Sequence, residues 1–131
     1  MERAPDLVAF DQMAQDAFAD LPADFRRLCG NVVIHVAEEA APDVLKDLNI
    51  SDPLELSGLF EGVAITQASV TDPIAAPNHI HLYRRSILAE LRERGNITLE
   101  TLIAHVLVHE IGHHFGLSDE DMHRIEKTSH D

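Results

Sequence analysis

One segment near the end of the chain constrains the fold more than any other. Residues 98–116, TLETLIAHVLVHEIGHHFG, are the longest and most apolar stretch with helical spacing. Thr98 is a suitable N-cap, Glu100 lies in the first turn where the helix dipole favours an acid, and Gly116 ends the helix. The residues of this helix expected in the core are Val106, Val108, Ile111 and Phe115. We therefore expect the other elements to pack around it.

The remaining sequence predicts an α+β fold with a small mixed sheet packed against helices. The expected helices are 5–20, 23–29, 41–49, 86–95 and 119–127, and the expected strands are 31–38, 58–67 and 79–85. Pro5 is suited to a first helical turn, Gly95 to a left-handed helix end and Ser118 to an N-cap, while 71–78 reads as a loop. A chain of 131 residues leads us to expect one domain, 1–131.

The long helix carries a recognisable metal-binding pattern. His109 and His113 are four residues apart, so their imidazoles project from one helix face, one turn from each other. That spacing lets both rings reach one zinc ion, and Glu110 follows the first histidine, where it can accept a proton from water and pass it to a leaving group. This HExxH pattern is typical of zinc peptidases.

Two histidines need a third protein ligand. A left-handed Gly116 can reverse the chain sharply and bring Asp119 back towards the ion, which gives the longer pattern HExxHxxGxxD. A chain with 9 histidines can contain HExxH by chance, and the glycine and aspartate at fixed offsets make the match far more specific. Glu120 and His123 are the alternative third ligands.

The other histidines have simpler interpretations. His114 is rotated about 100° from His113 and is expected at the surface or supporting the site. His105, one turn before His109, is expected to line the cleft or to pack. Tyr83 could donate to a transition-state oxyanion or pack under a helix, and Cys29 reads as a buried apolar residue.

The composition excludes several partners and sites. A net charge of −13 opposes binding to nucleic acid or to an anionic membrane surface. The single cysteine allows no intrachain disulfide, the N-terminus has no apolar run of a signal peptide, and no segment is apolar enough to span a bilayer. We expect a cytoplasmic protein.

Three segments together resemble a known family, the small bacterial minimal zincin-like metallopeptidases. They are GLFEG (58–62), IHLYRRSI (80–87) and VLVHEIGHHFGLSDEDMHRIE (106–126), and the resemblance extends over about residues 20 to 127. It implies a one-domain zincin fold, with a mixed sheet packed on the helix that bears the motif. It also implies zinc ligands His109, His113 and Asp119 and a catalytic Glu110.

The resemblance has one clear departure. Metzincins have a methionine turn beneath the metal, but 12 residues follow Asp119 here, and Met122 is too close to serve. We therefore expect a cleft with little lower wall, which a second subunit or a partner protein could complete. The segment 58–66 is the candidate edge strand for holding a peptide substrate.

Three functions remain to be distinguished. The first is a zinc metallopeptidase in which Glu110 acts as the general base on peptide or protein substrates. The second is a non-catalytic zinc-binding or interaction module whose cleft holds a partner. The third is a small metal-dependent endoribonuclease, which the charge of −13 disfavours.

Overall fold

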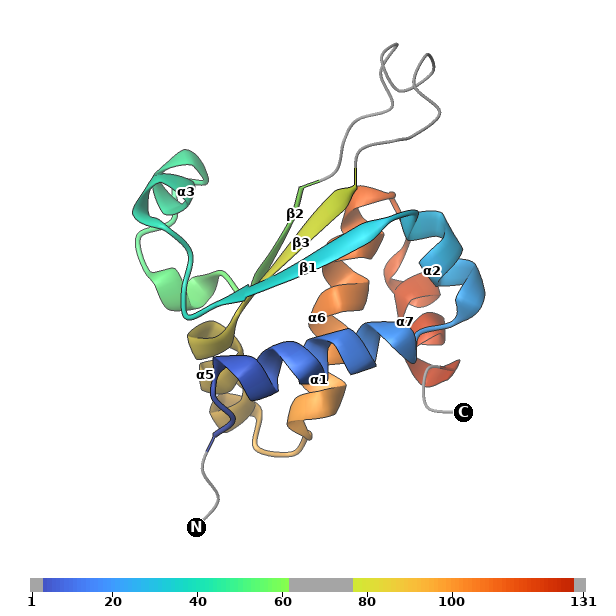
Figure 1. Ribbon diagram of the computed structural model, residues 1–131, viewed down its shortest axis with the longest axis horizontal. Helices are drawn as coiled ribbons and strands as arrows, with labels where there is room; N and C mark the ends of the chain where they lie inside the picture. Colours follow the sequence, from blue (N-terminus) through green and yellow to red (C-terminus); the bar gives the residue numbers. More distant parts are fainter. Residues whose placement is uncertain (1–3, 62–76, 129–131) are drawn as a thin grey trace.

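The computed structural model describes residues 4–61 and 77–128 (Figure 1). Its elements in chain order are α1 (Leu7–Ala19), α2 (Ala23–Cys29), β1 (Val32–Ala37), α3 (Pro42–Asp47), the 3-10 helix η1 (Pro53–Glu55), β2 (Gly58–Glu61), β3 (Asn78–Tyr83), α5 (Arg84–Arg94), α6 (Leu99–His114) and α7 (Asp119–Thr128). The α+β architecture predicted from the sequence is confirmed.

The three described strands form a mixed sheet in the order β1-β3-β2. β1 runs parallel to β3, with Ile34 opposite Ile80, and β2 runs antiparallel to β3, with Gly58 opposite Leu82. Because β3 takes the centre, β2 is an edge strand of this sheet. That is the position predicted for the segment beginning at Gly58; its continuation beyond Glu61 lies outside the described residues.

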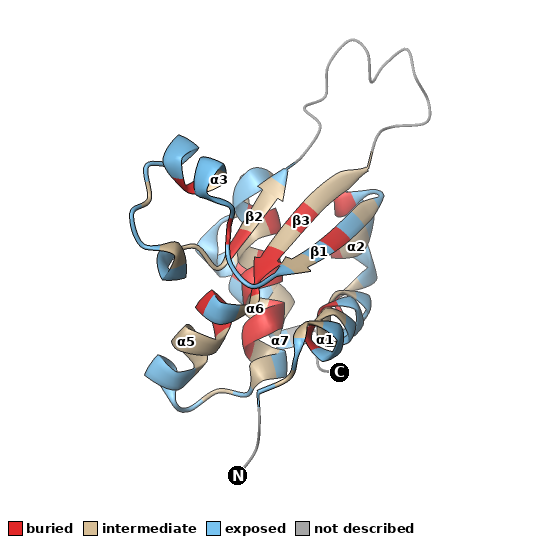
Figure 2. Cartoon of the chain, turned by 60° about the vertical axis from the view of Figure 1, so that its left-hand side comes forward, coloured by how far each residue is buried: buried red, intermediate tan, exposed pale blue. Residues whose placement is uncertain are grey.

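Helix α6 lies in the core, as its apolar sequence predicts. Thr98 caps it, because its Oγ1 accepts a hydrogen bond from the Thr101 N–H at 3.2 Å. The predicted core residues Val106, Val108 and Ile111 are buried, and Phe115 is partly buried against them. The sheet packs on α6 through β2, and α1 lies across α6 and against β1 (Figure 1). Buried residues gather where these elements meet (Figure 2).

The chain reverses after α6 in the predicted way. Gly116 has φ +73°, a left-handed conformation that glycine adopts at little cost. The Leu117 N–H donates to the Gly112 carbonyl at 2.8 Å, and the Asp121 N–H donates to Ser118 Oγ at 3.0 Å. These bonds end α6 and start α7, which therefore packs back against α6.

Several boundaries differ from the sequence prediction. Helix α1 begins at Leu7, because the Asp6 carboxylate accepts the Ala9 N–H at 2.9 Å and caps it; Pro5 therefore precedes the helix and does not occupy its first turn. The strand expected at 79–85 ends at Tyr83, where α5 begins. Most of the predicted loop 71–78 lies outside the described residues. No described helix meets the length and apolarity required of a membrane span.

Candidate functional site

Helix α6 presents a row of histidines along one side. His105, His109 and His113 recur every four residues, so they follow one another at successive turns. The ring centroids of His105 and His109 are 4.0 Å apart, and those of His109 and His113 are 5.7 Å apart. The two histidines of the HExxH pattern are therefore neighbours, as predicted, and His105 extends the row.

Helix α7 brings acidic side chains to this row. A cavity of about 550 Å³ lies between α6 and α7, lined by Thr101, Ala104, His105, His109, Asp119, His123, Glu126 and Lys127. Two predicted metal ligands, His109 and Asp119, thus face one cavity. The third, His113, lies one turn further along α6 and is exposed. His123, a rival third ligand, lines the cavity, while Glu120 is exposed outside its lining.

Glu126 makes the closest contacts in the cavity, and the sequence analysis did not select it. Its Oε1 lies 2.6 Å from His105 Nδ1 and its Oε2 lies 3.4 Å from His109 Nε2. Among the described residues, His105, His109 and Glu126 are the group of three potential ligands whose atoms lie within 4.8 Å of one another. A sequence signal existed: Asp119, His123 and Glu126 occur at i, i+4 and i+7, on one face of α7.

The donors at this site fit a zinc ion chemically. Two atoms that bind one zinc at about 2.0–2.1 Å in a tetrahedral arrangement lie roughly 3.3–3.4 Å apart, which matches the separation of His109 Nε2 and Glu126 Oε2. Burial, followed by the neighbouring His105, lowers the pKa of His109, which favours the neutral imidazole that a metal requires. The predicted set of His109, His113 and Asp119 is not gathered as closely in the described residues as the set that contains Glu126.

Glu110 lies beside the edge strand. A Cβ built on Gly58 would lie 3.2 Å from Glu110 Cγ and 3.1 Å from Val106 Cγ1, so the absence of a side chain lets β2 approach α6 closely. Burial raises the pKa of Glu110, and nearby His113 opposes that shift. The candidate general base thus has the motif histidines beside it and an edge strand against it.

A protein-family model matches most of the chain. The family model described as zincin-like metallopeptidase matches residues 29–128, from the end of α2 to the end of α7. The chain belongs to this family. Membership supports a hydrolase of the peptidase type and a metal, typically zinc. A search of curated proteins finds no match.

Two further residues of this zincin-like chain were singled out in the sequence. The exposed His114 contacts β2, where its ring centroid lies 4.3 Å from that of Phe60. This agrees with the expected surface or supporting role. Tyr83 is buried in a small cluster with Ala40 and Leu45, so it packs under α3. Its pKa is raised by burial first and then by Glu61 and Glu110.

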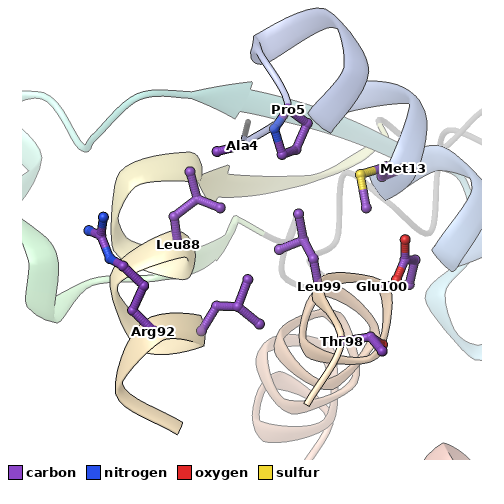
Figure 3. A pocket seen from close by; sticks show the side chains of 9 residues that line it. Ala4, Pro5, Met13, Leu88, Arg92, Thr98, Leu99 and Glu100 are labelled. Carbon is purple, nitrogen blue, oxygen red and sulfur yellow. The ribbon is translucent and has the colours of Figure 1, made fainter. Parts of the chain in front are cut away.

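A cavity of about 590 Å³ lies at the opposite end of the motif helix (Figure 3). Its lining residues are Ala4, Pro5, Met13, Leu88, Leu91, Arg92, Thr98, Leu99 and Glu100. They come from the segment before α1, from the middle of α1, from α5, and from the N-cap and first turn of α6, and they include no histidine. The metal chemistry of this zincin-like chain is therefore assigned to the α6–α7 side and not to this cavity.

Proposed function

We propose that the chain is a zinc-dependent metallopeptidase. The observation that carries this proposal is the position of Glu110: it follows the histidine that faces the acids of α7, and it lies against an edge strand of the sheet. A peptidase needs these three features together, namely a metal, a base and a place for an extended peptide.

The proposed ligands are His109, His113 and Asp119, as the motif predicts. Glu126 would lie beside the ion, because its Oε2 approaches His109 Nε2, while its Oε1 holds His105 at Nδ1 and the His105 ring lies against that of His109. A zinc ion bound here would polarise the scissile carbonyl and lower the pKa of a water molecule. The His113 and Asp119 side chains are both exposed, so they are free to rotate towards the ion.

Glu110 would then move the protons. Its raised pKa brings the carboxylate closer to the operating pH, so it can take a proton from the attacking water and give it to the leaving amine. The substrate would bind as an extended strand along β2, whose other edge pairs with β3. Phe60 of β2 and His114 at the end of α6, whose ring centroids lie 4.3 Å apart, border that strand.

The test compares wild type with Glu110→Gln on a broad library of flexible peptides. Zinc-loaded wild type should cleave some of them, and the variant should be about 10²–10⁴-fold slower while keeping one equivalent of zinc. Glu100→Gln, at the far end of the same helix, is the matched control and should keep full activity. Equal inertness of wild type and Glu110→Gln would count against the proposal.

A non-catalytic zinc-binding or interaction module is the second candidate. The contact between Glu126 and His109 favours it, because it engages a motif histidine within the chain. In that case a partner protein or second subunit would cover the α6–α7 cavity, and zinc would bind without turnover.

An endoribonuclease is disfavoured by the net charge of −13. A reducing cytoplasm suits the buried, unpaired Cys29.

A further inference from the structure

The sheet carries a second group of histidines on the face turned away from α6. His35 of β1 lies opposite His81 of β3, and Glu61 of β2 lies opposite His79 of β3. Side chains alternate across a strand, and the neighbours Ile34, Ile80 and Leu82 enter the core. His35, His79, His81 and Glu61 therefore project from the outer face, and we call them the outer-face cluster.

The outer-face cluster is arranged as two adjoining pairs. His35 Nε2 lies 2.9 Å from His79 Nδ1, and His81 Nε2 lies 2.7 Å from Glu61 Oε1. The ring of His35 stacks between the other two, with centroids 5.1 Å from that of His79 and 4.9 Å from that of His81. The three imidazoles thus form one continuous stack across β1 and β3.

The separation within the first pair is that of two ligands on one metal ion. Nitrogens that bind an ion at about 2.0–2.1 Å with a right angle between the bonds lie roughly 2.9 Å apart. His35 Nε2 and His79 Nδ1 already have this separation. For both nitrogens to bind an ion, the imidazole that donates in the hydrogen bond must carry its proton on its other ring nitrogen. A right angle is the geometry of Cu(II) and Ni(II) sites with nitrogen and oxygen ligands.

The surroundings favour a cation as well. Burial, followed by His81 and His79, holds the pKa of His35 below its usual value, so its imidazole is neutral near pH 7. Glu61 and Asp11 act on His35 in the opposite direction as nearby negative charges. The net charge of −13 further raises the local concentration of cations.

We propose that the outer-face cluster is a second metal site, selective for imidazole-preferring divalent ions and strongest for Cu(II). His35 and His79 are the paired ligands, and His81 or Glu61 supplies a further donor by rotation of an exposed side chain. The tighter three-ligand group among the described residues is in the other cavity. The outer site therefore begins from two placed ligands, keeps water on the ion and exchanges it readily.

The test uses Cu²⁺ on the full chain in a His109→Ala/His113→Ala background, which removes the motif histidines. Calorimetry should show one equivalent bound, and electron paramagnetic resonance should show couplings from two imidazole nitrogens. His35→Ala or His79→Ala should lower the affinity for this Cu²⁺ ion at least about tenfold. The matched control, His105→Ala, removes a histidine from the α6–α7 cavity and should leave the Cu²⁺ affinity of the outer-face cluster unchanged.

The background keeps this test independent of the proposed peptidase, because no activity is measured and the two motif histidines are absent. Circular dichroism should show each variant folded, as expected for changes on an outer sheet face. Two results would overturn the proposal. One is a background protein that binds no Cu²⁺; the other is a bound equivalent that survives both His35→Ala and His79→Ala.

Discussion

At the residue scale, the carboxylates of Asp119 and Glu126 are rival candidates for the third zinc ligand. Both line the cavity that His109 faces, but Glu126 alone is within 4.8 Å of two histidines in the described residues. Asp119 lies three residues after the left-handed Gly116, the position at which the pattern HExxHxxGxxD predicts the third ligand. These two observations favour different acids as the third ligand of the proposed zinc site.

We expect Asp119→Asn to lower zinc affinity more than Glu126→Gln does. Loss of a ligand should cost more than about 100-fold, whereas loss of a group that orients a ligand typically costs about 10–100-fold. Competition titrations with a chromogenic chelator would measure both affinities, with Glu120→Gln on the exposed side of the same helix as the control. The opposite ranking would assign Glu126 as the third ligand.

Cys29 offers a prediction independent of the metal. Its side chain is fully buried, and burial raises the pKa of its thiol to about 11 from a usual value of 9.0. Only the thiolate reacts with a thiol reagent, and the raised pKa lowers the fraction of thiolate in the folded state. At pH 8, Cys29 of the folded protein should therefore be labelled at least about 100-fold more slowly than in the unfolded chain. Ellman's reagent with and without guanidinium measures this ratio. Similar rates in both states would mean that α2 opens readily.

At the element scale, the α6–α7 contact depends on a close fit between Gly112 and Met122. A Cβ added to Gly112 would lie 2.4 Å from Met122 Sδ and 2.8 Å from its Cγ, while Met122 is fully buried. Gly112 lies between the motif histidines, so Met122 packs against the helix at the site itself. Met122 is too close to Asp119 in the sequence to form a methionine turn. In the structure it packs against Gly112.

Gly112→Ala should therefore destabilise the fold despite the better helix propensity of alanine. Overpacking costs about 1–3 kcal/mol, and the propensity gain of about 1 kcal/mol offsets part of it. Gly112→Ala combined with Met122→Ala should be less destabilised than the sum of the two single changes, because the new methyl enters the space that Met122 vacates. Urea unfolding of the four proteins gives the coupling. Strict additivity would show that the two residues do not share that space.

The elements show what could be read from the sequence and what could not. The ends of α6 were predictable, since Thr98 and Gly116 act through their own local bonds and dihedrals. Glu126 was not selected because its role depends on how α7 rotates against α6, which is set by the packing of Met122 on Gly112. The stacking of His35 on His81 likewise requires the parallel register of β1 and β3, a long-range pairing that no local pattern specifies.

At the scale of the whole molecule, the core extends beyond the part matched by the family. The match begins at residue 29, yet Phe10 and Ala14 of α1 are fully buried in the cluster that contains Leu107 and Ile111 of α6. Helix α1 therefore supports the motif helix through the shared core. Truncation of α1 would therefore remove part of the hydrophobic core.

The proposed ligands connect α6 to α7, so zinc binding should stabilise the fold globally. A ligand present at 100 times its dissociation constant adds about 2.7 kcal/mol to the free energy of unfolding. For a chain of 131 residues that corresponds to roughly 10 °C in the unfolding temperature. Differential scanning calorimetry with zinc should show this rise, and a chelator should reverse it. His109→Ala/His113→Ala should lose most of the shift while keeping its metal-free unfolding temperature close to wild type, because His113 is exposed and His109 is only partly buried. An equal shift in that variant would place the stabilising ion elsewhere on the molecule.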